Sequence, residues 1–304
     1  MAPNSTKRIQ MLRQTVKRAL YVLDPQLSPQ EQRRRIETLA RLIIHLPSGA
    51  TKQTVSTGKV EGEWVIPSQF DSETAVLYLH GGGYTLCSPT THRGITGALA
   101  LACNSRLFVP NYRLAPEHPF PAALEDALDS YRWLLGQGFS PKHIAIGGDS
   151  AGGGLTLATA ISLRDSGEPL PGALFLLSPW TDLTFSSESH RTRRAIDPIF
   201  GGVDESMNPK FIPAYLGRED PSNPLISPLL GDLQGMPSTI IHVGDNEILL
   251  NDSTGVEEKM SAAGVDVHIR VWDGLWHVFQ AFVPLLPEAR QSIAEIGEFI
   301  SMHI

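Results

Sequence analysis

The fold is decided by one stretch of the chain, His143-Ile144-Ala145-Ile146-Gly147-Gly148-Asp149-Ser150-Ala151-Gly152-Gly153. Residues 143–146 form a short apolar run that is typical of a buried strand, and residues 153–164 are predicted to form a helix. Between them, residues 148–152 match the pattern G-x-S-x-G in the strand–turn–helix context that this pattern requires. Such a turn is sharp, and a Cβ at either glycine would collide with neighbouring elements. We therefore expect Ser150 to be a nucleophile in front of a helix N-terminus, which favours negative charge.

Strands and helices alternate on both sides of this turn. Two paired antiparallel strands are predicted at residues 54–60 and 63–66. Further strands are predicted at residues 75–79, 106–109, 143–146, 173–177, 239–243 and 267–271, and helices at residues 122–135, 153–164, 255–263 and 293–302. This alternation predicts an α/β fold with a mostly parallel, doubly wound sheet of about eight strands.

Two segments are predicted to form a helical cap. Residues 1–48 carry apolar side chains at helical spacing, and Ser28 and Glu31 have the spacing of a capping box. Residues 181–236 are rich in proline and glycine and are too long for a simple connection. We expect residues 1–48 to be an N-terminal cap segment and residues 49–304 a catalytic domain, with residues 181–236 inserted as the rest of the cap.

A glycine-rich loop follows the predicted strand at residues 75–79. It reads His80-Gly81-Gly82-Gly83, and glycines leave backbone N–H groups open to a developing oxyanion. Loops of this type supply one oxyanion donor, and the residue after the nucleophile supplies another. We expect the amides of Gly82, Gly83 and Ala151 to form the oxyanion hole, with His80 anchoring the loop.

The general base should be a histidine after the last strand, and the acid should precede it in the chain. His277 lies in such a loop, whereas His242 and His268 lie within predicted strands. The predicted strand at residues 239–243 is followed by three candidate acids, Asp245, Glu247 and Asp252. Any of these carboxylates could orient and stabilise the imidazolium, so spacing leaves the three candidates open.

Charge and hydropathy exclude several classes of protein. The 304 residues carry a net charge of −7 and have a pI near 5.8, whereas nucleic-acid-binding domains usually have a pI above roughly 9. No run of about 18 apolar residues predicts a membrane span. Basic residues near the start form either a solvated helix face, which we favour, or a membrane-surface helix. These residues are Lys7, Arg8, Arg13, Lys17, Arg18, Arg33, Arg34 and Arg35.

The cysteine content indicates a reducing compartment. Cys87 and Cys103 are the two cysteines of the chain, which is too few for a disulfide framework or a metal cluster. The N-terminus also lacks the apolar core of a signal peptide. A cytoplasmic location is therefore expected, with no metal ion.

With these motifs in hand, the chain resembles the hormone-sensitive-lipase-like carboxylesterases, bacterial family IV of the α/β-hydrolase superfamily. The resemblance runs from about residue 55 to the end of the chain. Further matching stretches are Tyr112-Arg113-Leu114-Ala115-Pro116-Glu117, Ser178-Pro179-Trp180, Asn223-Pro224-Leu225, Ser227-Pro228-Leu229 and Gly274 to Phe279. The family's D-P-L stretch corresponds to Glu247-Ile248-Leu249, so the resemblance selects Glu247 as the acid, with Glu in place of Asp. Cys87 stands where the family commonly has glycine, and it either narrows the pocket mouth or packs there.

The resemblance implies a function and a set of partners. It implies a carboxylic ester hydrolase that acts on short- to medium-chain esters through Ser150, His277 and Glu247, by an acyl-enzyme intermediate and without a cofactor. It also implies a small-molecule ester substrate and a homodimer through the outer strand that begins at Val267 and ends at Val271. Nucleic acid and integral membrane association are not expected.

Other functions are compatible with the same motifs. An amidase, a deacetylase or an acyltransferase could use the same site, and some relatives on this scaffold bind small molecules without catalysis, although they tend to lose the histidine. Five side chains are candidates for the substrate pocket, although the same residue types are equally typical of a core: Trp180, Phe200, Phe211, Tyr215 and Leu249.

Overall fold

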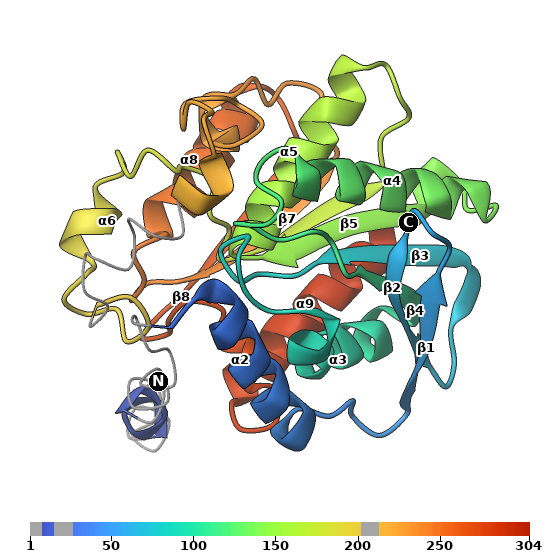
Figure 1. Cartoon of the computed structure of the whole chain (residues 1–304), viewed down its shortest axis with the longest axis horizontal. Helices are drawn as coiled ribbons and strands as arrows, with labels where there is room; N and C mark the ends of the chain where they lie inside the picture. Colours follow the sequence, from blue (N-terminus) through green and yellow to red (C-terminus); the bar gives the residue numbers. More distant parts are fainter. Residues whose placement is uncertain (1–7, 15–26, 202–212) are drawn as a thin grey trace.

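The computed structural model describes residues 8–14, 27–201 and 213–304. One sheet of eight strands runs through this part of the chain, in the order β1-β2-β4-β3-β5-β6-β7-β8 (Figure 1). The strands are β1 (Ala50–Ser56), β2 (Glu61–Pro67), β3 (Asp71–Leu79), β4 (Ser105–Pro110), β5 (Ile144–Asp149), β6 (Ala173–Leu177), β7 (Ser238–Gly244) and β8 (Val267–Trp272). The pairs β1–β2 and β2–β4 are antiparallel and the other pairs are parallel, which confirms the predicted fold class.

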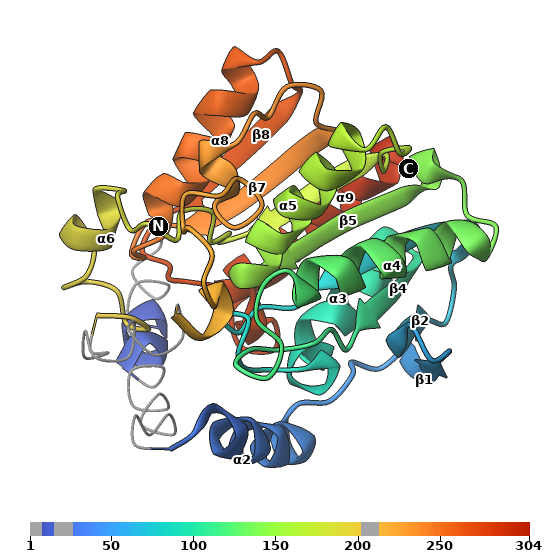
Figure 2. The same ribbon diagram turned by 45° about the horizontal axis from the view of Figure 1, so that its top comes forward.

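Helices cover both faces of the sheet. Helices α4 (Ala122–Gly136), α5 (Ala151–Asp165) and α8 (Leu250–Ala262) pack on one face, and α3 (Arg93–Cys103) and α9 (Pro287–His303) pack on the other (Figure 2). Alternate residues of a strand supply the two cores, as Leu77 on one side and Val76 and Tyr78 on the other illustrate for β3. Burial on both faces explains why the parallel strands have unbroken apolar sequences.

Two element predictions need correction. The strand predicted at residues 54–60 lies four residues earlier, at Ala50–Ser56, because residues 57–60 form a turn that is closed by a 3.0 Å bond from Thr57 N to Val60 O. Helix α3 was not predicted at all. It is buried along most of its length, and a Cβ at Gly97 would lie 2.3 Å from Pro47 Cδ. Its sequence therefore lacks the polar face by which an amphipathic helix is recognised.

Helix α2 (Pro29–Ile43) begins with the predicted capping box. The Ser28 amide donates to the Glu31 carboxylate at 3.0 Å, and the Glu31 amide donates to Ser28 Oγ at 3.3 Å. Arg33 then fixes the helix on the catalytic domain, because its guanidinium donates to Glu117 at 2.8 Å and to the carbonyl oxygens of Thr85 and Ala115. The Arg33 side chain therefore binds the catalytic domain. The sequence suggested instead that it lies on a solvated helix face or on a membrane-surface face.

The segment between β6 and β7 contains helix α6 (Ser189–Thr192) and the 3₁₀ turn η4 (Pro228–Leu230). Three further 3₁₀ turns are η2 (Pro89–His92), η3 (Pro141–His143) and η5 (Phe279–Phe282). Lys7, Lys17, Arg18 and Phe211 lie outside the described residues. Among the described helices, none has the length and apolar character that a membrane span requires.

Candidate active site

The turn between β5 and α5 has the sharp geometry that the glycines predict. Ser150 has φ 54° and ψ −122°, a left-handed conformation that is strained for a residue with a side chain. Its amide donates to Leu177 O at 2.9 Å, and its carbonyl accepts from the amide of Trp180 at 2.8 Å. A Cβ at Gly148 or Gly152 would lie 2.1 or 1.9 Å from Leu79 O. Both glycines are therefore required by close contact with the end of β3.

Asp149 connects this turn to the glycine-rich loop. Its carboxylate accepts from the Tyr78 hydroxyl at 2.7 Å and from the Gly81 amide at 2.9 Å, and His92 Nε2 lies 3.2 Å away. Burial alone would raise the pKa of Asp149, but the charge and hydrogen bond of His92, with the other donors, lower it to about 2. This role of Asp149 was not predicted from the sequence. Its position inside the G-x-S-x-G stretch was the only signal available.

The glycine-rich loop folds back over the end of β3. Gly82 has φ 117° and Gly83 has φ 61°, and a Cβ at Gly82 would lie 2.3 Å from Leu86 O. Cys87 packs against this loop, since its Cβ lies 2.9 Å from the position that a Cβ on Gly82 would occupy. His80 is buried, and its ring stacks on Tyr112 at a centroid distance of 4.2 Å. Burial lowers the pKa of His80 to about 3, so the ring is neutral.

The predicted base and one predicted acid are in direct contact. His277 Nδ1 lies 3.1 Å from Glu247 Oε2, and both side chains are buried. The other oxygen of Glu247 accepts from the Gly244 amide at 3.2 Å. Glu247 follows β7 and His277 follows β8, so the pair lies at the carboxyl edge of the parallel strands, the same edge as Ser150.

The two other candidate acids have different partners. Asp245 accepts from the Gly274 amide at 2.7 Å and so tethers the loop that carries His277. Asp252 lies 2.7 Å from His190 Nε2 and accepts from the amides of residues 181 and 182 at 2.8 and 2.9 Å. The contact with His277 therefore distinguishes Glu247 from both.

His277 and Glu247 both have shifted pKa values. Burial would lower the pKa of His277, but the hydrogen bond and charge of Glu247, together with the charges of Asp197 and Asp149, raise it above its usual 6.5. Burial raises the pKa of Glu247, and the hydrogen bond and charge of His277 oppose that rise. A carboxylate held against an imidazole in this way stabilises the imidazolium that forms when the ring accepts a proton.

Ser178 joins the serine turn to the histidine loop. It has φ 46° and directly follows Leu177, whose carbonyl accepts from the Ser150 amide. The Ser178 hydroxyl oxygen accepts from the Val278 amide at 3.1 Å, and a hydrogen bond from Ser178 also helps to hold down the pKa of Glu247. Leu177 and Ser178, at the end of β6, thus bring together the Ser150 turn and the loop of His277, which lie more than a hundred residues apart in sequence.

Comparison with known proteins agrees with this arrangement. Residues 76–281 match the α/β hydrolase fold family. The chain superimposes with a TM-score of 0.89 on an esterase of the bacterial hormone-sensitive lipase family, with 40% identity and coverage of 100% of this chain and 99% of that one. The chain belongs to the hormone-sensitive lipase family of α/β hydrolases. This confirms the resemblance seen in the motifs.

Two further relatives of this hormone-sensitive lipase family member are informative. An acetyl-hydrolase of Streptomyces hygroscopicus is 42% identical over 246 residues, which is 81% of each chain. EstE5, in a crystal soaked with p-nitrophenyl butyrate, is 39% identical with a TM-score of 0.91 and coverage of 100% of this chain and 99% of EstE5.

The candidate pocket residues of this family member divide into two groups. The Phe200 ring lies 5.0 Å from the His277 ring, and the half-buried Trp180 adjoins Ser150 through the main-chain bond described above. Tyr215 is 2% exposed and stacks on Tyr84 at 3.7 Å, and Leu249 is 3% exposed at the start of α8. Tyr215 and Leu249 are thus nearly fully buried, as Ser150 and His277 also are, and their contact with substrate stays a prediction.

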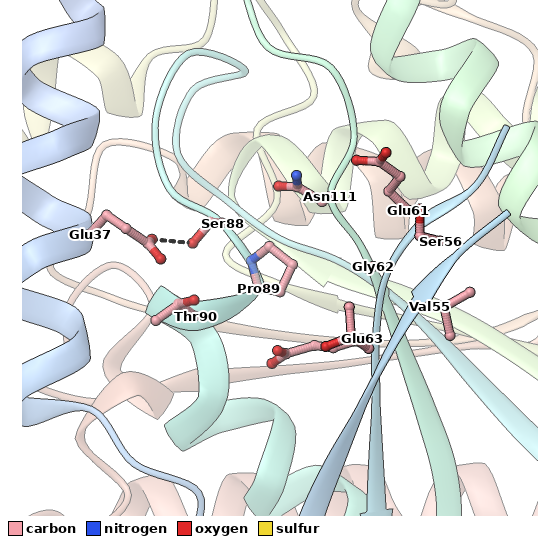
Figure 3. Close-up of a pocket in the computed structure, with 11 residues that line it drawn as sticks. Glu37, Val55, Ser56, Glu61, Gly62, Glu63, Ser88, Pro89, Thr90 and Asn111 are labelled. Carbon is pink, nitrogen blue, oxygen red and sulfur yellow. Dashed lines mark hydrogen bonds between the residues drawn. The ribbon is translucent and has the colours of Figure 1, made fainter. Parts of the chain in front are cut away.

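A groove of about 300 Å³ lies elsewhere, between α2, β1, β2 and η2 (Figure 3). Its lining includes Glu37, Glu61, Glu63 and Asn111, and Glu37 accepts from Ser88 Oγ at 2.6 Å. None of the predicted site residues lines this groove. In residues 8–14, 27–201 and 213–304, no cluster of His, Cys, Asp and Glu could hold a metal ion.

Proposed function

We propose that this chain is a carboxylic ester hydrolase that cleaves short- to medium-chain esters with Ser150 as nucleophile, His277 as base and Glu247 as acid. The observation that carries the proposal is the buried contact of 3.1 Å between His277 and Glu247, at the edge of the sheet where Ser150 occupies a strained turn. Relatives named esterase, such as that of Acinetobacter venetianus, which is 38% identical over 274 residues, support the reaction class.

The proposed reaction has two halves. His277 takes the proton of Ser150 as the hydroxyl oxygen attacks the ester carbonyl, and the oxyanion accepts from the amides of Gly82, Gly83 and Ala151. The imidazolium then protonates the leaving alcohol as the carbon–oxygen bond breaks, which leaves an acyl group on Ser150. Water, deprotonated by His277, attacks this acyl group and releases the acid. Every proton moves through His277, so the steps call for no cofactor.

A short acyl group is the best-supported substrate feature. One relative is named acetyl-hydrolase, and EstE5 was soaked with a butyrate ester. The Phe200 ring lies 5.0 Å from the His277 ring, so an aromatic side chain borders the catalytic base and limits the space beside it.

A homodimer through β8 and a cytoplasmic location complete the proposal. Strand β8 is the last strand of the sheet, and its Val271 side chain is 44% exposed. An unpaired edge of this kind offers backbone groups to a second copy. The same two segments, residues 1–48 and 181–236, are proposed as the cap over the catalytic domain.

The test is a comparison of the wild-type chain with Ser150→Ala on p-nitrophenyl acetate, butyrate, octanoate and palmitate. Wild-type turnover should fall from butyrate to palmitate, and Ser150→Ala should lower kcat by about 10⁵–10⁶-fold while the circular dichroism spectrum stays unchanged. Near-normal turnover by Ser150→Ala would refute the mechanism. Preference for the matching anilide would assign an amidase instead.

A further inference from the structure

Asp197 contacts two parts of the candidate site that lie far apart in the chain. It belongs to the segment between β6 and β7, and it is 2% exposed. One carboxylate oxygen accepts from the amides of Ile199 and Phe200, at 2.7 and 3.0 Å. The other accepts from the Ile248 amide at 2.9 Å. Ile248 is the residue directly after Glu247, so the second bond reaches the loop of the acid.

We propose that Asp197 is a positioning residue for the Glu247–His277 pair, an inference that rests on the function proposed above. Its first oxygen closes a local turn that sets the Phe200 ring 5.0 Å from the imidazole. Its second oxygen fixes the main chain beside Glu247. A single carboxylate thus holds the ring that packs against His277 and the loop that carries the acid in one arrangement.

Ser189, in the same segment between β6 and β7, also contacts Ile248. The Ser189 hydroxyl donates to Ile248 O at 2.6 Å, so both main-chain polar groups of Ile248 are bonded to the segment between β6 and β7. The Ser189 amide also donates to Asn251 Oδ1 at 2.8 Å. The acid loop is therefore held by this segment as well as by its own strand, and Asp197 supplies the bond closest to Glu247.

The chemistry of the contact requires a carboxylate. Three N–H groups point at Asp197, and an ionised carboxylate is an acceptor at both oxygens. Burial raises the pKa of Asp197, and the three amides with the nearby His277 oppose that rise. An asparagine could keep the local turn with its one oxygen, but its NH₂ group would then face the Ile248 N–H as donor against donor.

The charge of Asp197 also reaches the imidazole. Three carboxylates act on His277, namely Glu247 from the loop after β7, Asp149 from the end of β5 and Asp197 from the segment after α6. All three raise the pKa of His277. Loss of the Asp197 charge should therefore lower the pH at which His277 becomes protonated, which a purely structural role would not do.

The test compares Asp197→Asn with Asp182→Asn. Asp182 is a matched control, because it is a buried carboxylate in the same segment that closes its own turn, at 2.9 Å to the Thr184 amide and 3.0 Å to the Ser186 amide. On p-nitrophenyl butyrate, Asp197→Asn should lower kcat roughly tenfold with little change in KM, and should move the acid limb of kcat/KM to lower pH. Asp182→Asn should lower Tm without moving that limb.

A second measurement reads the imidazole directly. Proton NMR of the His277 Nδ1–H, followed against pH, should show protonation at lower pH in Asp197→Asn than in the wild type. If Asp197→Asn does not fold, Asp197→Ser replaces it, because the serine hydroxyl can still accept from the amides of the local turn. His277 of Asp197→Ser should likewise become protonated at a lower pH than in the wild type.

Three results separate the claims. An unchanged acid limb and unchanged NMR titration in folded Asp197→Asn would overturn the positioning role while leaving the esterase intact. Equal shifts in Asp197→Asn and Asp182→Asn would also overturn it, because the effect would not depend on the bond to Ile248. Loss of the proposed function has a different signature, namely full ester turnover by Ser150→Ala.

Discussion

At the scale of single residues, the site depends on positions where one side chain or its absence decides the geometry. Ser150 and Ser178 both have positive φ, and they occupy the ends of neighbouring strands β5 and β6. Strained conformations of this kind persist only where the surrounding contacts fix them. Here Gly148 and Gly152 allow the backbone of β3 to approach, and Glu247 completes a buried pair with His277.

The close contact at Gly152 leads to the first prediction. Gly152→Ala would place a Cβ 1.9 Å from Leu79 O, so the helix or the strand must shift. We expect a loss of roughly 1–3 kcal/mol in the free energy of unfolding, measured by urea denaturation, together with a large fall in kcat. Gly136→Ala is the control, because a Cβ there meets nothing within 4 Å. Equal stability of the two variants would contradict the close packing.

The second prediction concerns the acid. Glu247→Gln should lower kcat by about 10³–10⁴-fold, because the amide cannot stabilise the imidazolium or hold its tautomer. Asp245→Asn should have a small effect, since an amide oxygen can still accept from the Gly274 N–H. The measurement is steady-state hydrolysis of p-nitrophenyl butyrate. Equal losses in the two variants would show that Glu247 is not the acid.

The third prediction concerns pH. The neutral form of His277 is the active base, and Glu247, Asp197 and Asp149 raise its pKa above 6.5. Activity should therefore be full well above this pKa and should fall as the pH drops through it, with the midpoint of kcat/KM above 6.5. Removing a negative charge moves that midpoint down, so Glu247→Gln should shift it to lower pH. A midpoint below 6.5 in the wild type would contradict the raised pKa.

At the scale of elements, the parallel strands deliver the site. Strands β3, β5, β7 and β8 end at one edge, and each is followed by a loop that carries one functional group. The runs of apolar residues made these strands predictable, because burial on both faces leaves a clear signature. Helix α3 and the start of β1 were missed, because α3 has no polar face and β1 is mostly exposed.

The fourth prediction tests how helix α2 is held on the catalytic domain. Arg33→Ala should lower Tm, because its guanidinium bonds Glu117 and the carbonyls of two loop residues next to the glycine-rich loop. Partly buried pairs with several bonds contribute more than exposed pairs do. Arg35→Ala on the exposed face of the same helix should leave Tm nearly unchanged. Differential scanning calorimetry provides the comparison, and equal Tm values for both variants would contradict the anchoring role.

At the scale of the whole molecule, the sequence predicted the site better where residues are close in the chain. Ser150 and its glycines form one motif, so their arrangement follows from local geometry. Asp149, Ser178 and Asp197 were missed, because their roles arise from contacts between segments that lie up to a hundred residues apart. For Leu249 and Tyr215, which are 3% and 2% exposed, apolar character in the sequence does not distinguish the wall of a pocket from core packing.

The fifth prediction concerns assembly. If β8 joins two copies, sedimentation of the wild-type chain should show a dimer that dissociates on dilution. Val271→Lys should weaken that dimer, because a charge at an exposed edge-strand position opposes pairing. Leu285→Lys, at another exposed apolar residue outside the sheet, should leave the dimer intact. A wild-type chain that sediments as a monomer at all concentrations would exclude the β8 dimer.

The central claim is that the hydroxyl of Ser150 is the nucleophile, and a covalent probe tests it most directly. An alkyl fluorophosphonate should lose fluoride as its phosphorus forms a bond to Ser150 Oγ. Intact-mass and peptide mass spectrometry should then locate a single adduct on the peptide that contains Ser150, with esterase activity lost in proportion to labelling. Ser150→Ala should remain unlabelled. An adduct on another residue, or labelling of Ser150→Ala at the wild-type rate, would contradict the account.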